Sequence, residues 1–350
     1  MPLMPEQFDR YHRQTILPQI GAAGRERLGK SRVLLIGVGA LGGHLADQLA
    51  RAGVGLLRIA DRDIVELTNL QRQTLFDERD AAASAAKAEA AARRLSQVNS
   101  QITIEPLVTD VWAGNIEELI EGIDLILDGT DNVQTRYLIN DAAVKSGISW
   151  IHGACVGTEG RVLAIVPGQG ACLRCVYPDP PAAGELPTCD TAGILQSAAA
   201  AVASLQAAAA TRILTGQFTG ADQKLWKLDI WSGRFASIDL SDARREDCPC
   251  CGRGAFAFLD AALADSATSL CGRNAVQIRP ARPWNNADFD RAVANLRRVG
   301  LVEQGTFFSR CRLAESQGLT LTCFRDGRLL VHGTADTGRA KAIYAKFIGT

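Results

Sequence analysis

The stretch VLLIGVGALG, residues 33–42, decides the fold of this 350-residue chain. Its first four residues, Val33–Ile36, form a continuous apolar run, which is typical of a short strand buried on both faces. The G-x-G-x-x-G turn that follows, Gly37 to Gly42, allows backbone N–H groups at the start of a helix to approach a phosphate. We expect that helix over about residues 41–52. The stretch therefore predicts a nucleotide-binding strand–turn–helix unit.

Strands and helices alternate along the rest of the first two thirds of the chain. We expect further strands at residues 56–60, 102–108, 124–128, 149–151 and 160–166, and helices at 81–95, 135–145 and 198–214. Such alternation predicts a doubly wound, mostly parallel Rossmann-like sheet, so the fold class is α/β. Residues 1–254 are expected to form this first domain, preceded by a polar arm and a helix within residues 1–30.

The last part of the chain predicts a small, separate α+β module. Residues 255–350 would hold a connector with a short apolar helix (252–268), then the module itself. Within the module we expect strands at 275–278, 307–313, 319–324 and 329–332, and helices at 286–299 and 337–347.

Composition excludes several classes of partner. Lys+Arg and Asp+Glu are both 38, so the zero net charge predicts no nucleic-acid partner. No apolar run approaches the roughly 20 residues of a membrane span, and the N-terminus lacks the pattern of a signal peptide. We therefore expect a cytoplasmic protein with no membrane partner. In that reducing compartment, ten cysteines favour metal ligation or thiol chemistry over disulfides.

The glycine turn alone does not identify the nucleotide. Asp61 lies 19 residues after Gly42, at the end of the next expected strand, where a carboxylate can bind ribose hydroxyls. Taken by themselves, the turn and Asp61 favour NAD or FAD.

Two further features favour ATP. TNLQRQ (residues 68–73) and Lys87 would surround a phosphate with amide, guanidinium and ammonium groups, which suits a departing pyrophosphate. The alternative is that Arg72 and Lys87 belong to a solvated face. DGTDN (residues 128–132) follows an apolar strand, so Asp131 could hold Mg²⁺ beside a triphosphate. Asn132 is equally suited to cap the next helix.

Together these motifs resemble the ThiF/MoeB/HesA family, bacterial relatives of ubiquitin-activating enzymes. The resemblance also includes RYHRQ (residues 10–14) and covers roughly residues 6–252. It implies that Asp61 holds the ribose, that Asp131 positions Mg²⁺, and that Arg72 and Lys87 contact the phosphates of ATP. It also implies that Arg13 reaches into the neighbouring subunit's site, which makes the protein a homodimer. The expected nucleotide site comprises Gly37, Gly39, Ala40 (often glycine in the family), Gly42, Asp61, Asn69, Gln71, Arg72, Lys87, Asp131 and Asn132.

The cysteines predict a structural metal site. Cys172-x-x-Cys175 and the CPCC stretch of residues 248–251 supply two C-x-x-C pairs, the usual donors of a closed tetrahedral Zn²⁺ site. Cys248 or Cys250 could join Cys251; the two-residue spacing and the family pattern favour Cys248. Cys189, in LPTCD, is expected either to form a thioester or persulfide or to be incidental. Three other cysteines lie in apolar strands and are expected in the core: Cys155, Cys311 and Cys323.

The resemblance implies a complete reaction. The C-terminal Gly-Gly carboxylate of a small ubiquitin-like sulfur carrier (ThiS or MoaD type) attacks the α-phosphate of Mg·ATP, and pyrophosphate leaves an acyl-adenylate. A sulfur donor, a cysteine desulfurase or rhodanese-like protein, then acts in thiamine or molybdenum-cofactor synthesis. The expected catalytic residues are Arg13, Arg72, Lys87, Asp131 and Cys189. Alternatives are adenylation of a small peptide or a modified tRNA base, and an NAD(P)-binding oxidoreductase.

Overall fold

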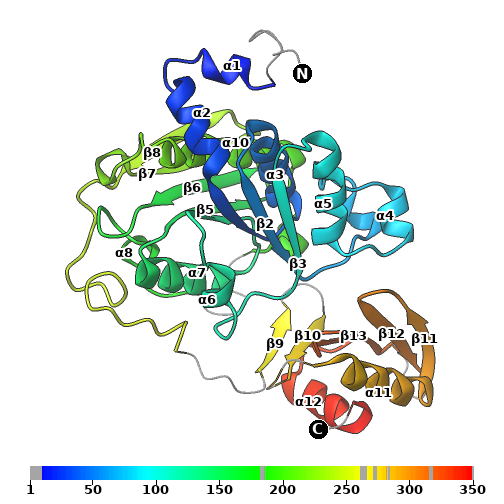
Figure 1. The fold of residues 1–350 in the computed structure, drawn as a ribbon. Coiled ribbons are helices and arrows are strands. Elements are labelled where there is room, and N and C mark those ends of the chain that lie inside the picture. Colours follow the sequence, from blue (N-terminus) through cyan, green and yellow to red (C-terminus); the bar gives the residue numbers. More distant parts are fainter. Residues whose placement is uncertain are drawn as a thin grey trace. The chain divides into compact units, whose positions relative to one another are not determined.

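A computed structural model places most of the chain (Figure 1). The residues that it describes are 10–181, 185, 187–260, 266–270, 274–280, 282, 284–314 and 318–348. The chain divides into two compact units: Met1–Pro181 with Gly193–Ala261, and Ala182–Ala192 with Ala262–Thr350. Each unit is described by itself below.

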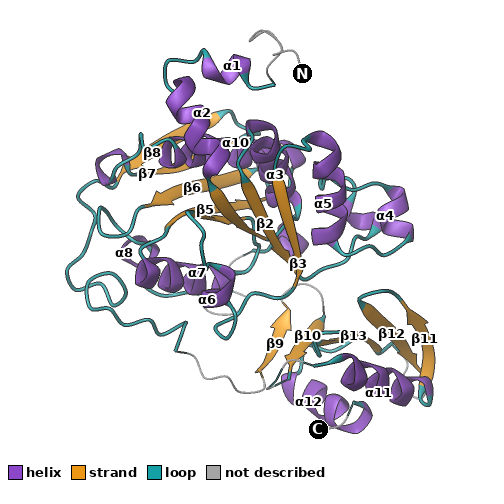
Figure 2. Cartoon of the chain, in the orientation of Figure 1, coloured by secondary structure: helices purple, strands orange, loops and turns teal. Residues whose placement is uncertain are grey.

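The first unit is built on one eight-stranded sheet of order β3-β2-β1-β4-β5-β6-β7-β8 (Figure 2). The strands β1 to β5 pair in parallel, and β6 to β8 continue the sheet antiparallel. The α/β class with a mostly parallel central sheet is therefore confirmed. The bounds are β1 Arg32–Ile36, β2 Leu56–Asp61, β3 Thr103–Val108, β4 Leu125–Asp128, β5 Ser149–Val156, β6 Glu159–Ile165, β7 Lys224–Asp229 and β8 Arg234–Asp239.

Helices cover both faces of this sheet, and each face has its own hydrophobic core. One core lies beneath α3 (Ala40–Ala52), α5 (Lys87–Val98) and α10 (Gln196–Leu214). The other lies beneath α6 (Ile116–Leu119), α7 (Val133–Ser146) and α8 (Leu173–Val176). Small side chains such as Ala199 and Ala203 allow α10 to pack closely on α3, β5 and β6. The remaining helices are α1 (His12–Thr15), α2 (Gly21–Lys30), α4 (Glu78–Ala82) and the 3₁₀ turns η2 (Leu67–Asn69) and η3 (Gly220–Asp222).

One apolar helix of this unit needs comment, and one prediction needs correction. By length and composition α10 could cross a membrane, although the sequence analysis expected no apolar run of that length. Its buried face packs in the core of the unit. The expected single helix at 81–95 is instead α4 and α5. Between them Ser84 adopts a positive φ of 46° and Ala86 bridges to Ile64, so pairing with another segment overrides the helix propensity of the alanines.

The second unit contains a six-stranded antiparallel sheet of order β11-β12-β13-β14-β10-β9. Two helices, α11 (Asn286–Arg297) and α12 (Thr337–Phe347), pack on it around one core. The strands are β9 Ser266–Leu270, β10 Ala275–Arg279, β11 Gly300–Gln304, β12 Phe308–Leu313, β13 Thr320–Phe324 and β14 Leu329–His332; β9 and β11 were not predicted. The short helix α9 (Cys189–Ala192) also belongs to this unit. The helix expected within 252–268 is absent from the described residues of that range, which form turns up to 260 and then β9.

Candidate active site

The glycine turn after β1 is tightly packed and leaves helix donors free. Gly37 has a φ of +85° and its N–H donates to the carbonyl of Ala60 over 2.8 Å. A Cβ at Gly42 would lie 1.9 Å from the Gly37 oxygen, so no larger residue fits there. The N-cap of α3 is Gly39, and no side chain caps the helix. The first N–H groups of α3 are therefore available to an anion.

Asp61, the last residue of β2, supports this turn. Its Oδ2 accepts the N–H of Val38 over 2.7 Å, and its Oδ1 accepts the N–H of Asp63 over 2.8 Å. Burial raises the pKa of Asp61, while the charge of nearby Lys87 opposes that effect. A carboxylate has about four acceptor sites. The two that remain are compatible with the ribose role, but the observed role of Asp61 is to hold the turn.

The segment from Asn69 to Gln73 runs beside the turn. Asn69 is buried and its Oδ1 accepts the N–H of Glu66 over 3.0 Å, whereas Gln71 is exposed. Arg72 donates from Nη1 to the Thr68 carbonyl over 3.0 Å. Gln73 is 5% exposed, and its Nε2 lies 3.7 Å from where a Cβ of Gly39 would be. Gln73 is the last residue of the TNLQRQ motif, but the sequence analysis predicted no role for it.

Lys87 does not belong to a solvated face. It is 5% exposed and is the first residue of α5. Its backbone N–H donates to the Asp63 carbonyl over 2.9 Å, and its Nζ lies 3.3 Å from Asp63 Oδ2. The ammonium group is therefore held near Asp61, beside the end of β2.

The turn after β4 meets the glycine turn. The N–H of Gly129 donates to the carbonyl of Ile36 over 2.8 Å, and a Cβ at Gly37 would lie 2.9 Å from the Gly129 oxygen. Asp131 follows with an exposed side chain. Asn132 caps α7, because its Oδ1 accepts the N–H of Thr135 over 3.2 Å. An exposed carboxylate at this edge is a suitable Mg²⁺ ligand.

Arg13 lies far from the glycine turn of its own chain. Two residues before it, the Tyr11 ring lies against Gly53, at the C-terminal end of α3. The Tyr11 hydroxyl also accepts a hydrogen bond from Asn99, at the C-terminal end of α5, over 2.7 Å. The glycine turn and Lys87 lie at the opposite ends of these helices. Thirteen residues of α3 at 1.5 Å each span about 20 Å.

The four predicted zinc ligands form one cluster. Their sulfur atoms all lie within 4.8 Å of one another, with 3.6 Å between Cys172 and Cys248 and 3.4 Å between Cys175 and Cys251. Tetrahedral bonds of about 2.3 Å would separate the sulfurs by about 3.8 Å, so the set fits Zn²⁺. Cys250 lies outside the cluster, and its sulfur accepts a hydrogen bond from Asn140 over 3.2 Å. The three cysteines expected in the core are buried: Cys155, Cys311 and Cys323.

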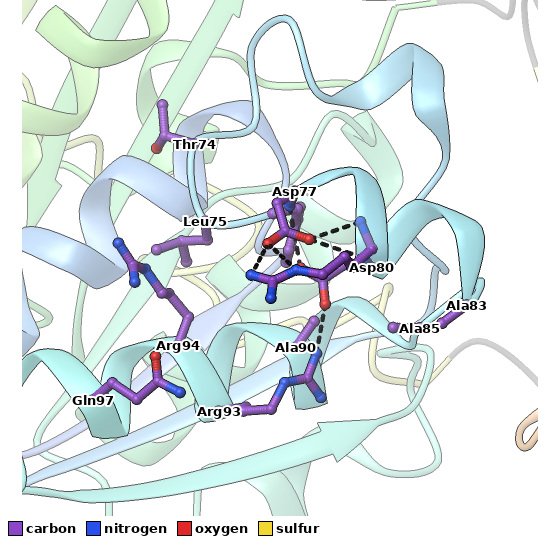
Figure 3. Close-up of a pocket in the computed structure, with 12 residues that line it drawn as sticks. Thr74, Leu75, Asp77, Asp80, Ala83, Ala85, Ala90, Arg93, Arg94 and Gln97 are labelled. Carbon is purple, nitrogen blue, oxygen red and sulfur yellow. Dashed lines mark hydrogen bonds and ion pairs between the residues drawn. The ribbon is translucent and has the colours of Figure 1, made fainter.

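Two further features are Cys189 and a cavity beside α4 and α5. Cys189 begins α9, which groups with the second unit. A cavity of about 660 Å³ lies between the loop of residues 74–77, α4 and α5, and Figure 3 shows side chains that line it. None of the predicted site residues lines it. Its charged rim is partly paired internally, since Arg93 contacts Asp80 and Arg79 contacts Asp77.

Comparison with known proteins gives a consistent result. A family model described as "ThiF family" matches residues 11–250. A sulfur carrier protein ThiS adenylyltransferase of Bacillus subtilis is 43% identical over 341 residues, which is 97% of this chain and 99% of that protein. The SAMP-activating enzyme E1 of Haloferax volcanii is 37% identical over 71% of this chain and 90% of its own length. A crystal structure of E. coli MccB with ATP matches 71% of this chain and 75% of MccB with a TM-score of 0.61; at 21% identity it shows the fold alone.

Proposed function

The chain belongs to the ThiF family and is an adenylyltransferase, and from this premise we propose its substrate and the roles of its residues. It uses ATP to adenylylate the C-terminal glycine carboxylate of a small ubiquitin-like sulfur carrier of the ThiS type. The observation that carries this proposal is the similarity to the B. subtilis enzyme over 97% of the chain, which spans both units. We take residues 1–254 as the adenylation domain and 255–350 as connector and appended module.

The reaction is a displacement at the α-phosphate of ATP. A carboxylate oxygen of the carrier forms a bond to that phosphorus, and the bond to the bridging oxygen breaks, so pyrophosphate leaves with the electron pair. No general base is required, because the attacking carboxylate is ionised at neutral pH. The first N–H groups of α3, together with Arg72 and Lys87, stabilise the charge that accumulates on the phosphates.

Two metal ions complete the proposal. Asp131 would hold Mg²⁺, which neutralises phosphate charge when it is bound. Cys172, Cys175, Cys248 and Cys251 would hold Zn²⁺, and four cysteine ligands would leave no open coordination position, which suits a purely structural role. The transfer of sulfur to the adenylate, by a cysteine desulfurase or a rhodanese-like donor, would follow as a separate step.

Arg13 enters the reaction only if a second copy supplies it. The contacts of Tyr11 hold this part of the chain at the far ends of α3 and α5, about 20 Å from the glycine turn. Arg13 is nevertheless exposed and therefore free to contact a neighbour. We therefore propose a homodimer in which each site receives Arg13 from its partner.

Exchange of labelled pyrophosphate into ATP tests the proposed function. The wild-type protein should catalyse exchange that requires a ThiS-type carrier ending in Gly-Gly, and a carrier lacking the last glycine should support none. K87A should reduce exchange by about 10²- to 10³-fold while remaining folded. If exchange proceeds with a peptide or tRNA acceptor and with no carrier, the proposed substrate is wrong. If the protein binds NADH in preference to ATP, the assignment of ATP as its nucleotide is wrong.

A further inference from the structure

A charged cluster of two buried residues and one partly exposed arginine lies behind the turn that carries Asp131. Asp128 ends β4 and is completely buried, His152 lies on β5, and Arg136 lies in the first turn of α7. The proposed reaction gives none of the three a role. Burying an ionised carboxylate completely is costly unless its oxygen atoms are paired, so the cluster requires an explanation.

The hydrogen bonds of Asp128 are fully used. Its Oδ1 accepts the backbone N–H of Thr130 over 2.9 Å and the Thr130 hydroxyl over 2.8 Å. Its Oδ2 accepts from Arg136 Nε over 3.1 Å and from His152 Nδ1 over 2.9 Å. All four acceptor sites of the carboxylate are thus engaged, and two of them hold Thr130, the residue before Asp131.

Arg136 fixes the same turn from its other side. Its Nη2 donates to the Thr130 carbonyl over 2.7 Å and contacts the Gly153 carbonyl of β5 over 3.3 Å. Thr130 is therefore held at its N–H, its hydroxyl and its carbonyl. The orientation in which the chain enters Asp131 is determined by this cluster.

The glycine turn has support of its own. Asp61 holds the N–H of Val38, and Gly37 donates to Ala60, so neither contact depends on the cluster. The two turns meet where Gly129 packs on Gly37. The cluster therefore controls where Asp131 stands relative to a phosphate site that is already formed.

We propose that Asp128, Arg136 and His152 are positioning residues, which hold Asp131 at a fixed place relative to the glycine turn so that it can bind the Mg²⁺ of Mg·ATP. This inference rests on the proposed function, because it assumes that Asp131 is a magnesium ligand. His152 is the member that no sequence motif contains. It is also the member that can be replaced without removing a charge.

The charges of the cluster agree with this role. Burial opposes ionisation of Asp128, but the Arg136 ion pair and the His152 hydrogen bond hold the pKa of its carboxyl below the usual value. Burial lowers the pKa of His152. A neutral imidazole that donates from Nδ1 to an ionised carboxylate is the arrangement that results.

Binding of ATP with and without Mg²⁺, measured by calorimetry, tests the proposal. H152V removes the donor to Asp128, whereas H152N places an amide nitrogen where Nδ1 was. H152V should weaken binding of Mg·ATP about tenfold, the lower end of the effect of losing a direct partner of a metal ligand, because His152 acts on Asp131 through Asp128 and Thr130. Binding of ATP in EDTA should change less than about twofold. H152N should restore most of the magnesium-dependent affinity. R136K should behave like H152V, because one ammonium group cannot replace the contacts of Arg136 with Asp128, Thr130 and Gly153.

Q223L is the matched control. Gln223 is 1% exposed and holds two backbone carbonyls, at Ala164 and Ala171, away from this turn. Both Q223L and H152V should lower the melting temperature, because each removes buried hydrogen bonds. Q223L should leave the effect of Mg²⁺ on ATP binding unchanged. Equal losses with and without Mg²⁺ in H152V, or an H152N variant no better than H152V, would overturn the inference and leave the proposed function intact. If the wild-type protein binds no Mg·ATP, the proposed function is wrong, and this inference is wrong with it.

Discussion

The placement of Arg13 predicts complementation between two inactive variants. In R13A the site loses a cation that only the partner can supply, and in K87A the site loses its own buried ammonium. Each loss should reduce carrier-dependent exchange by about 10²- to 10³-fold, the usual effect of removing one stabilising group from a charged transition state. When subunits of the two variants reassort at random, about half of the dimers contain one of each under a simple two-fold assembly.

The arrangement in space sets the expected recovery. In a mixed dimer one site combines an intact Lys87 with the partner's intact Arg13, and the other site lacks both. Half of the sites in half of the dimers are then intact, so the mixture should regain about a quarter of wild-type activity. Exchange is measured after co-refolding, with tags on each variant to confirm that mixed dimers form. If mixed dimers form and activity stays at the level of the parents, Arg13 acts within its own chain or not at all, and the reasoning from the 20 Å separation is wrong.

Three further predictions follow from the contacts. C248S should lose bound zinc, measured by atomic absorption, and unfold at a markedly lower temperature, whereas C250S should keep the metal because Cys250 lies outside the cluster; equal zinc loss in both would contradict this. G37A should greatly weaken ATP binding, since the new Cβ meets the Gly129 oxygen at 2.9 Å, while G147A, at a similar φ of +71° with open space, should cost only about 1 kcal/mol of stability. Burial lowers the pKa of His152, so below about pH 6.5 the unfolded chain binds a proton that the folded chain excludes. The free energy of unfolding should therefore decrease as the pH is lowered below about 6.5, by up to about 1.4 kcal/mol per pH unit. When the free energy of unfolding is measured with urea at several pH values, it should depend less on pH in H152N than in the wild type. An identical pH dependence in the two proteins would show that His152 is not responsible.

Local sequence signals were sufficient where one segment decides its own conformation. The apolar run at 33–36 is β1, and the glycine turn starts α3 at Ala40, one residue before the expected position. The spacing of Cys248 and Cys251 likewise indicated the pair that the structure brings together. In each case the chemistry requires residue types at fixed separations within a few positions, so the pattern is visible without the fold.

The predictions failed where contacts with a segment distant in sequence determine the local structure. The alanines at 81–95 favour a helix anywhere, yet residues 85 and 86 pair with Val65 and Ile64 and interrupt it. That interruption places Lys87 at the start of α5, where it becomes a buried site residue. The β7–β8 hairpin was missed although KLWKLD alternates weakly, because half of the residues of β7 and all of those of β8 are exposed to solvent.

The cluster behind Asp131 shows why a site is harder to predict than a fold. Asp128 and Arg136 lie eight residues apart and His152 lies on the next strand, so no single spacing connects them. Only the parallel pairing of β4 with β5 and the crossover through α7 bring the imidazole and the guanidinium to one carboxylate. A short motif such as the glycine turn is visible in the sequence because its residues contact one group and therefore keep a fixed spacing. The residues that hold such a motif in place have no such restriction, and for that reason substitutions at His152 should alter magnesium dependence although no sequence pattern marks the position.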